Sequence, residues 1–298
     1  MFSMHVADKI FEEERPRLER FAYRMLGSRA DADDVLQEAF LRWAGADRSD
    51  VQSPAAYLSS IVARLCIDQR RSIEARKASY VGPWLPEPIV GAEESDPARR
   101  LETAETVSLA LLMILESLSP VERAAFLLKR VFDYGYDEIA AILDKSAPNC
   151  RQLVHRAELA IEGGRPRFTP DPGEAERVTQ AFLGACTSGD VQGLLELLAD
   201  DVVVYSDGGG KVPAALAPVR GADRAARFFV GVTKKQPAGA VVEHARVNGQ
   251  PGIVILVAGR ADTVLTLDVS HGRIVTCYAI RNPEKLARVS HDLANRTN

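Results

Sequence analysis

The first part of the chain repeats apolar residues with the period of an α-helix. One apolar stripe has the spacing i, i+3, i+4, i+7 and consists of Leu36, Ala39, Phe40 and Trp43. A second stripe with this spacing consists of Leu58, Ile61, Val62 and Leu65. It follows Ser53-Pro54, an N-cap residue with proline at the first helical position. We therefore expect helices from about residue 10 to residue 77, with a polar loop at 45–52.

A second helical block is expected at 101–161. The capping box Ser119-Pro120-Val121-Glu122 opens a helix to about residue 131, and a short helix is expected at 136–143. After the turn Asp144-Lys145-Ser146, Ser146 caps a third helix, whose buried face would be Cys150, Leu153, Val154 and Ala157. Two short helices with a three-residue turn form a helix-turn-helix, and the alternative is a plain helical bundle.

The outer face of that third helix carries side chains that read bases. It presents Asn149, Arg151, Gln152, His155 and Arg156. Arginine pairs with guanine edges and asparagine or glutamine with adenine edges in the major groove of DNA. This face is therefore a candidate for DNA recognition.

The last part of the chain mixes helices and strands. Helices are expected at 174–186, 191–198 and 223–232, and strand-like runs at 202–205, 240–247, 253–258, 263–269 and 274–280. Consecutive strands after helices indicate an α+β domain, with the helices packed on one face of a curved antiparallel sheet.

A proline-rich segment separates the first two blocks. Residues 78–97 contain four prolines and two glycines, so the segment is expected to be extended rather than helical. It also contains Trp84-Leu85-Pro86-Glu87-Pro88. A free tryptophan would expose much apolar area, so we expect this segment to dock on another part of the chain. An incidental tryptophan is the alternative.

Composition and charge refine this organisation. A chain of 298 residues suggests about two domains. The net charge of −4 does not suggest a nucleic-acid ligand, yet the charges are segregated. Residues 64–77 and 145–167 are each basic, whereas an acidic cluster consists of Asp31, Asp33, Asp34 and Glu38. Two basic segments and one acidic segment suggest two polyanion contacts and one contact with a basic protein, and ordinary solvated helix faces are the alternative.

Targeting and metal signals are absent from the sequence. The longest apolar run, Ile253–Ala258, is far shorter than a membrane span, and residues 1–14 lack the apolar core of a signal peptide. The four cysteines have no CxxC or CxxH spacing, which argues against a zinc site or a disulfide framework. We expect a cytoplasmic protein that has no contact with a membrane and needs no metal or cofactor.

Three segments resemble the extracytoplasmic-function sigma factors. Residues 31–43 resemble region 2.2 of that family, residues 53–72 resemble regions 2.3 and 2.4, and residues 118–156 resemble region 4. The resemblance covers about residues 8–165. One departure is Asp144, where the helix-turn-helix turn often has glycine; aspartate tolerates a left-handed backbone better than most residues.

The remainder resembles a SnoaL-like (NTF2-like) domain. Ser188-Gly189-Asp190 and the strand after Asp201 resemble the opening of that family. Three motifs are similar to those of sigma factors with a fused C-terminal SnoaL-like domain, the sigma-J type. The first is the tryptophan-proline motif at 84–88, and the others are Asp207-Gly208-Gly209-Gly210-Lys211 and Asn282-Pro283-Glu284-Lys285-Leu286.

The resemblance implies a multidomain protein with two all-α sigma domains and a C-terminal α+β SnoaL-like cone. Its domains would be region 2 at 8–77, a linker at 78–100, region 4 at 101–165 and the cone at 172–293. Its partners would be promoter DNA and core RNA polymerase, bound at the β′ clamp and the β flap.

The resemblance also assigns site residues. On the helix of region 2.2, one face would bind core polymerase and consists of Asp34, Gln37, Glu38 and Leu41. Contacts with the −10 element would come from Arg64, Asp68, Arg70 and Arg71, with Asp68 orienting a neighbouring arginine. Residues 46–52 would form the loop that holds a flipped −10 base. Contacts with the −35 element would come from Ser146, Asn149, Arg151, Gln152, His155 and Arg156. Tyr57 is expected in the core rather than on a stacking surface.

The C-terminal domain is expected to regulate the sigma regions by docking against the linker. The residues expected at this contact are Trp84, Leu85, Pro86, Glu87, Pro88, Asp207, Gly208, Gly209, Gly210, Lys211, Asn282, Pro283, Lys285 and Leu286. Trp84 would be the apolar anchor, and Glu87 would pair with Lys211.

An enzymatic role is the alternative for this domain. Its candidates would be Tyr205, Asp207, Asp268 and His271, but a histidine in a hairpin turn and an aspartate beside three glycines do not suit a dry catalytic wall. We do not expect an enzyme, and binding of a small ligand in the cone stays open.

Overall fold

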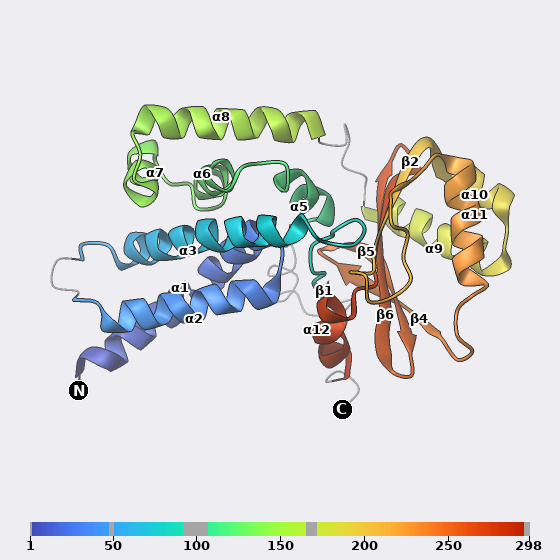
Figure 1. The fold of residues 1–298 in the computed structure, drawn as a ribbon, viewed down its shortest axis with the longest axis horizontal. Coiled ribbons are helices and arrows are strands. Elements are labelled where there is room, and N and C mark those ends of the chain that lie inside the picture. The colour runs from blue at the N-terminus through green and yellow to red at the C-terminus, as the bar shows by residue number, and fades with distance from the viewer. Residues whose placement is uncertain (1, 48–50, 92–106, 165–171, 295–298) are drawn as a thin grey trace. The chain divides into compact units, whose positions relative to one another are not determined.

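The computed structural model describes residues 2–47, 51–91, 107–164 and 172–294 (Figure 1). The chain divides into two compact units. We call residues 1–79 with 111–165 the helical unit, and residues 80–110 with 166–298 the C-terminal unit. The linker residues 80–91 therefore belong to the same compact unit as the C-terminal domain.

The helical unit has the helices that the sequence predicts. Region 2 consists of α1 (Phe2–Leu26), α2 (Arg29–Gly45) and α3 (Pro54–Lys77). Region 4 contains α6 (Pro120–Val131), α7 (Tyr136–Leu143) and α8 (Ala147–Gly164), preceded by the short helix α5 (Leu109–Leu115). The serine hydroxyls of Ser28, Ser53 and Ser119 accept hydrogen bonds from the first turns of α2, α3 and α6. Asp144 ends α7 in the left-handed conformation, with φ 53° and ψ 57°.

The predicted apolar faces of this unit are buried. Leu36, Ala39 and Trp43 of α2 are almost inaccessible, and Phe40 is half-buried against Phe11. The predicted inner face of α8, which consists of Cys150, Leu153, Val154 and Ala157, is buried as well. Helical periodicity is sufficient here because each helix buries only one stripe.

The C-terminal unit is built on a seven-stranded sheet with the order β1-β4-β5-β6-β7-β2-β3. Its strands are β1 (Val90–Gly91), β2 (Leu198–Asp207), β3 (Val219–Arg220), β4 (Val241–Val247), β5 (Gln250–Val257), β6 (Arg260–Ser270) and β7 (Arg273–Ile280). All neighbours pair antiparallel except β2 and β7, which are parallel. Two-residue turns with left-handed backbone, such as Asn248-Gly249 and His271-Gly272, connect β4 to β5 and β6 to β7.

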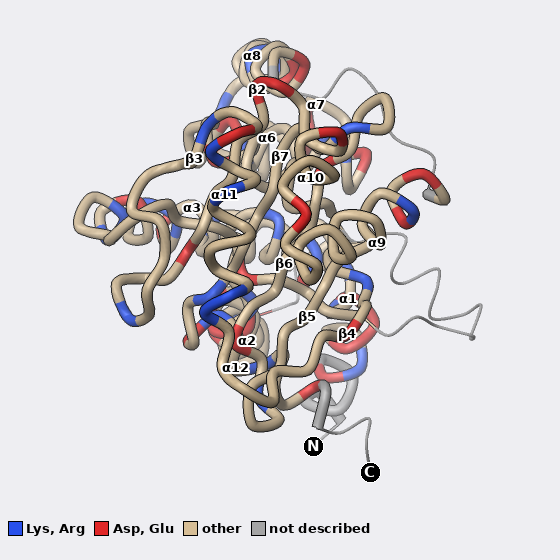
Figure 2. The backbone as a smooth tube through the Cα atoms, turned by 90° about the vertical axis from the view of Figure 1, so that its right-hand side faces the viewer, with Lys and Arg blue, Asp and Glu red and all other residues tan. Residues whose placement is uncertain are grey.

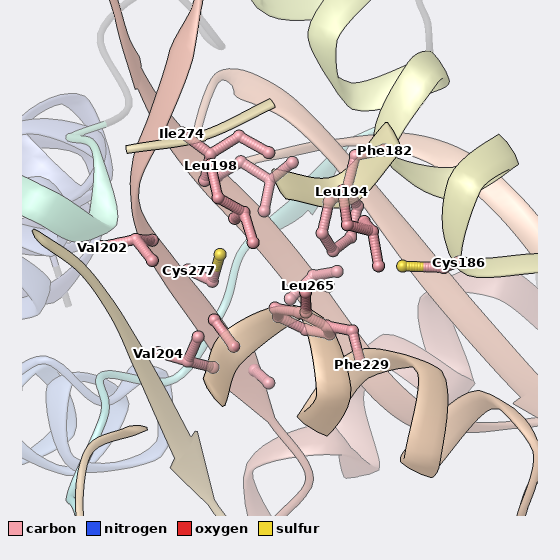
Figure 3. Packing of buried hydrophobic residues seen from close by; sticks show 14 of the residues in the cluster. Phe182, Cys186, Leu194, Leu198, Val202, Val204, Phe229, Leu265, Ile274 and Cys277 are labelled. Atoms are coloured by element: carbon pink, nitrogen blue, oxygen red, sulfur yellow. The ribbon is translucent and has the colours of Figure 1, made fainter. Parts of the chain in front are cut away.

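Helices cover both faces of the sheet. Figure 1 shows α9 (Pro172–Ser188), α10 (Val191–Leu197) and α11 (Ala222–Thr233) on one face, and α12 (Pro283–Ala294) on the other. The helices α9, α10 and α11 bring Phe182, Leu194 and Phe229 against the strand residues Val204 and Cys277 (Figure 3). This apolar cluster is the core of the α+β domain.

The linker contributes the edge strand of this sheet. Val90 pairs with Val247 and Gly91 with Arg246, so β1 extends the sheet beside β4. The expectation of an extended, docked linker is therefore correct for residues 80–91. Residues 92–106 lie outside the described part of the chain.

Candidate functional site

The predicted polymerase-binding face of α2 is exposed. Asp34, Gln37 and Glu38 are exposed, and Leu41 keeps 59 % of its surface accessible. Glu38 Oε1 accepts a hydrogen bond from Arg42 at 2.8 Å. A large apolar side chain among acidic and amide groups fits an interface with an apolar centre and a polar rim.

Three of the four predicted −10 residues are exposed on α3, and the fourth is not. Arg64 and Arg71 are exposed, and Asp68 lies 3.3 Å from Arg71, as expected for an orienting carboxylate. Arg70 is 1 % exposed and donates two hydrogen bonds to Glu116, at 2.9 and 2.7 Å. The prediction that Arg70 faces DNA is wrong for this structure, because its guanidinium is held inside the helical unit.

Glu116 is the centre of a buried ionic cluster in the helical unit. Its carboxylate accepts hydrogen bonds from Arg70, from Arg123 at 2.9 Å and from Lys77. Burial by itself raises the pKa of Glu116, but the charges of Arg123, Lys77 and Arg70 outweigh it and hold the pKa at about 2. Burial disfavours the charged form of Lys77 and lowers its pKa to about 8. Arg123 also donates to the carbonyl of Arg24 at 2.9 Å, so region 4 is fastened to both α1 and α3.

Further contacts join region 2 to region 4. The hydroxyls of Ser59 and Tyr134 are 2.9 Å apart and buried, and Phe21 stacks on Phe132 with ring centroids 5.2 Å apart. Arg64, a predicted −10 contact, donates to the carbonyl of Ile142 at 3.4 Å. The two regions that are predicted to bind DNA therefore pack directly on each other.

The outer face of α8 is exposed as predicted. Asn149, Arg151, Gln152, His155 and Arg156 are all exposed, and the Ser146 hydroxyl caps the first turn at 3.4 Å from Asn149 N. Arg156 is 3.2 Å from Glu122, and Arg151 lies over the Tyr136 ring at 4.9 Å. Basic and acidic positions both occur along α8, as Figure 2 shows.

The expected base-capture loop precedes α3, and Tyr57 lies in the first turn of that helix. Within the loop predicted at 46–52, residues 48–50 lie outside the described residues. Tyr57 is 38 % exposed and packs on Trp43 with ring centroids 5.8 Å apart. The expectation of a core tyrosine is therefore wrong, because Tyr57 covers the core from outside.

Within the C-terminal unit, Asp207 binds the linker. It is fully buried at the end of β2, and its carboxylate accepts hydrogen bonds from the Tyr80 hydroxyl at 2.6 Å and the Leu85 N–H at 2.8 Å. Lys285 of α12 lies 2.6 Å from the same carboxylate and also donates to the Leu85 carbonyl. Burial and the neighbouring Asp207 raise the pKa of the Tyr80 hydroxyl. The three motifs at 84–88, 207–211 and 282–286 thus meet in one site.

Two predicted details of this contact are wrong. The apolar anchor is Leu85, which is fully buried, whereas Trp84 is only half-buried. The Lys285 ammonium lies over the Trp84 ring, 4.2 Å from its centroid. The Trp84 face is thus used for a cation–π contact, which leaves part of the indole accessible. Lys211 pairs with Glu284 rather than with Glu87, and Glu87, Pro86 and Pro88 are buried.

The glycines allow the backbone after Asp207 to approach the linker. Gly209 has φ +61°, and a Cβ on it would lie 2.4 Å from the Asn282 amide nitrogen and 3.1 Å from the Tyr80 hydroxyl. A Cβ on Gly210 would lie 3.1 Å from Val81. Asn282 itself donates to the Tyr80 hydroxyl at 2.9 Å. Any larger residue at 209 would push the linker away.

A second attachment point was not predicted. Asn248, 1 % exposed in the β4–β5 turn, accepts a hydrogen bond from Ile89 N at 3.0 Å and donates to the Val107 carbonyl at 3.0 Å. In the sequence, Asn248 has only the pattern of a hairpin turn, which does not predict a contact with the linker. Tyr80 is marked only by its position before the tryptophan motif, which does not predict a contact with Asp207. The segment that joins α3 to α5 is residues 78–108, longer than the predicted linker at 78–100, and we call this whole segment the linker from here on. The C-terminal unit thus holds the linker at both Tyr80 and Val107.

The enzyme candidates do not converge. Tyr205 stacks on Tyr278, whose hydroxyl donates to Asp268 at 2.8 Å, whereas Asp207 binds the linker and His271 is exposed in its turn. Burial raises the pKa of Asp268 to about 6, and the Tyr278 hydrogen bond opposes this shift. None of these four residues lines the cavity that the described part of the cone encloses.

The described residues hold no group of histidine, cysteine or acidic side chains suited to a metal ion, and no helix among them is long and apolar enough to cross a bilayer. The four cysteines are buried free thiols.

Comparisons with known proteins agree with this arrangement. Residues 10–76 match the model of sigma-70 region 2, and residues 108–161 match that of sigma-70 region 4. The ECF RNA polymerase sigma factor SigJ of Mycobacterium tuberculosis is 34 % identical over 286 residues, with 92 % of this chain and 91 % of SigJ covered. A probable ECF sigma factor of that organism, SigI, is 33 % identical over 279 residues, with 91 % of this chain and 92 % of SigI covered.

The fold of the chain also matches a solved structure over nearly its whole length. The crystal structure of Mycobacterium tuberculosis SigJ covers 93 % of this chain and 97 % of its own, with a TM-score of 0.74. The chain belongs to the extracytoplasmic-function RNA polymerase sigma factors. It is thus a promoter-recognition subunit rather than an enzyme, with a SnoaL-like C-terminal domain, and it acts with core RNA polymerase and promoter DNA.

Proposed function

We propose that the C-terminal domain regulates this sigma factor in cis by holding the linker between regions 2 and 4. The observation that carries the proposal is the attachment of both Tyr80 and Val107 to one unit, through Asp207 and Asn248. With both points held, the distance between them is fixed by that unit and not by the length of chain between them.

The distance between the two promoter elements explains why holding the linker would limit promoter binding. The −10 and −35 elements are about 25 base pairs apart, which is roughly 85 Å of B-DNA. The 31 residues from 78 to 108 reach about 100 Å when fully extended, so a free linker can span that distance. A linker held at Tyr80 and Val107 cannot extend in this way. The direct contacts between regions 2 and 4, such as Ser59 with Tyr134, must also separate before both elements are bound.

We further propose which surfaces bind the partners. The exposed face of α2, with Leu41 among Asp34, Gln37 and Glu38, fits the basic coiled coil of the β′ clamp, and region 4 would bind the β flap. Arg64, Asp68 and Arg71 would meet the −10 element, and the outer face of α8 would meet the −35 element. The proposed place of action is the cytoplasm.

Run-off transcription with core polymerase tests the regulation. In the full chain, Asp207→Asn removes the charge that binds Lys285 and weakens the hold on Tyr80 and Leu85, so promoter output should rise. Asp200→Asn is the matched control in the same strand, because the Asp200 side chain is exposed and lies 3.9 Å from Arg273. Equal output from D207N, D200N and the unaltered chain would refute regulation by this contact.

A further inference from the structure

The outer face of α8 carries two exposed arginines whose surroundings differ. Arg151 lies in the second turn of the helix, and Arg156 lies in the third. Arg156 is 3.2 Å from the Glu122 carboxylate, so its charge is partly balanced within region 4. Arg151 makes no hydrogen bond or ion pair with any residue that the structure describes. The N–H donors of the Arg151 guanidinium are therefore available to a ligand.

An aromatic ring restrains Arg151 in this position. Its guanidinium carbon lies over the Tyr136 ring, 4.9 Å from the ring centroid. A cation–π contact attracts the positive charge to the ring face and needs no oxygen acceptor. The contact therefore restrains the side chain while its donors stay available for another partner.

Two helices fix the position of the Tyr136 ring. Tyr136 is the first residue of α7, and the N–H of Gly135 before it donates to Glu138 Oε2 at 2.7 Å, which completes the N-terminal cap of that helix. Lys129 of α6 donates to the Tyr134 carbonyl at 3.2 Å, and its ammonium lies 5.7 Å from the centroid of the Tyr136 ring. The half-buried ring is thus held by α6 and α7 and forms a fixed support beside α8.

An arginine held in this way suits the reading of a base. Helix-turn-helix proteins contact base edges with residues near the N-terminus of the second helix, which is where Arg151 lies. An arginine reads guanine by two parallel hydrogen bonds to O6 and N7. A side chain that is already restrained loses less rotamer freedom when it forms such a pair, so binding of the correct base is favoured.

We propose that Tyr136 is a positioning residue that holds Arg151 ready to read one guanine of the −35 element. The proposal rests on the assignment of the outer face of α8 to that element, made above. It also distinguishes the two arginines, because Arg156 shares its charge with Glu122 whereas Arg151 keeps its donors for DNA.

Selection from a random-sequence DNA library tests the proposal. Core polymerase that carries the full chain is mixed with the library, and sequencing of the bound and unbound duplexes gives the base preference at each position. One position of the −35 element should prefer guanine in the unaltered chain. Arg151→Ala should reduce this preference about fivefold or more. Tyr136→Leu should reduce the preference at the same position about twofold to fivefold, because leucine keeps apolar volume but not the aromatic face.

Two further variants separate positioning from structure. Tyr136→Phe keeps the ring and should restore the guanine preference that Y136L loses. Gln152→Ala is the matched control on the same exposed face, since it should change the preference at a different position and leave the Arg151 position unaltered. Urea unfolding of each variant establishes that region 4 is folded.

Three results would overturn the positioning role. An unreduced guanine preference in Y136L would show that Arg151 reads the base without the ring. An equal loss at every −35 position would show that Tyr136 only supports the fold of region 4. Equal losses in Y136F and Y136L would assign the effect to the hydroxyl. If R151A changes no position, the assignment of α8 to the −35 element fails together with this inference, whereas a defect in R151A without one in Y136L refutes the inference alone.

Discussion

The ammonium of Lys285 lies 2.6 Å from the carboxylate of Asp207, 78 residues earlier in the chain, and Asp207 is fully buried. Both groups also bind the linker, since Leu85 donates its N–H to Asp207 and its carbonyl accepts from Lys285. A buried carboxylate needs such partners because desolvation penalises its charge. The pair therefore joins the stability of the C-terminal domain to the docking of the linker.

Lys285→Met should destabilise the C-terminal unit by about 3 kcal/mol, because it leaves the Asp207 charge buried without its cation. Lys211→Met should cost less than about 1 kcal/mol, because its pair with Glu284 is exposed. Urea unfolding of both variants measures this difference. In a double-mutant cycle, Asp207→Asn combined with Lys285→Met should cost less than the sum of the single changes; additive costs would contradict a coupled pair.

The burial of Arg70 leads to a prediction that separates folding from DNA binding. Arg70→Ala leaves Glu116 short of one cation and should lower the free energy of unfolding of the helical unit by about 2–4 kcal/mol. Arg71→Ala removes an exposed side chain and should leave stability within about 0.5 kcal/mol while it weakens binding to −10 DNA. If R70A unfolds like the unaltered chain, the ionic cluster does not hold regions 2 and 4 together.

The lowered pKa of Glu116 predicts that the stability of the helical unit falls in acid. Its pKa is lowered from 4.5 to about 2 in the folded chain, so its contribution to stability is present above pH 4.5 and is lost as the pH falls towards 2. Glu116→Gln should remove this dependence and flatten the acid limb of the unfolding curve. A limb of unchanged slope in E116Q would show that other carboxylates cause the acid transition.

The raised pKa of Asp268 predicts the opposite pH dependence, a loss of stability as the pH rises. Burial raises its folded-state pKa from 3.8 to about 6, so the folded chain binds the extra proton between these values. Stability is therefore favoured below about pH 4 and falls as the pH rises through 6, by at most about 3 kcal/mol. Asp268→Asn keeps an acceptor for the Tyr278 hydroxyl and should lack this fall. Unfolding measured from pH 4 to pH 7 for both chains decides whether Asp268 is its source.

The exposed acidic face of α2 is predicted to contribute to the affinity for core polymerase. Reversal of Asp34 and Glu38 to lysine should weaken association with core polymerase while the helices remain intact, because both side chains are exposed. Reversal of Glu12 and Glu13 on α1 is the control for the change in net charge. Equal co-purification of the two double variants with core polymerase would rule out this face.

Much of the helical unit could be predicted from the sequence, because its determinants are local. The stripe at Leu36–Trp43, the serine caps and the left-handed Asp144 each act within one or two helical turns. Arg70 could not be placed in this way. Its partner Glu116 is 46 residues away, and an arginine on an otherwise polar helix face has the same sequence pattern whether it meets DNA or a buried carboxylate.

The linker site was predicted in outline only. Its three motifs marked the segments that meet, but not which atoms do so. Trp84 is the larger apolar side chain, yet Leu85 is the buried one, because Lys285 occupies the indole face. Asn248 reads as an ordinary turn residue, and only the folded chain brings it to Ile89 and Val107.

The distance between regions 2 and 4 in the full chain tests the central claim most directly. Spin labels at Glu19→Cys on α1 and Leu159→Cys on α8 occupy exposed positions, and the four native thiols are buried. Two variants release the linker from opposite sides, Leu85→Ala from the linker and Asp207→Asn from the domain, with Asp200→Asn as the control. Double electron–electron resonance should give one short distance in the unaltered chain and in D200N, and longer, broader distances in L85A and D207N. The same short distance in all four chains would contradict control of the sigma regions by the C-terminal domain.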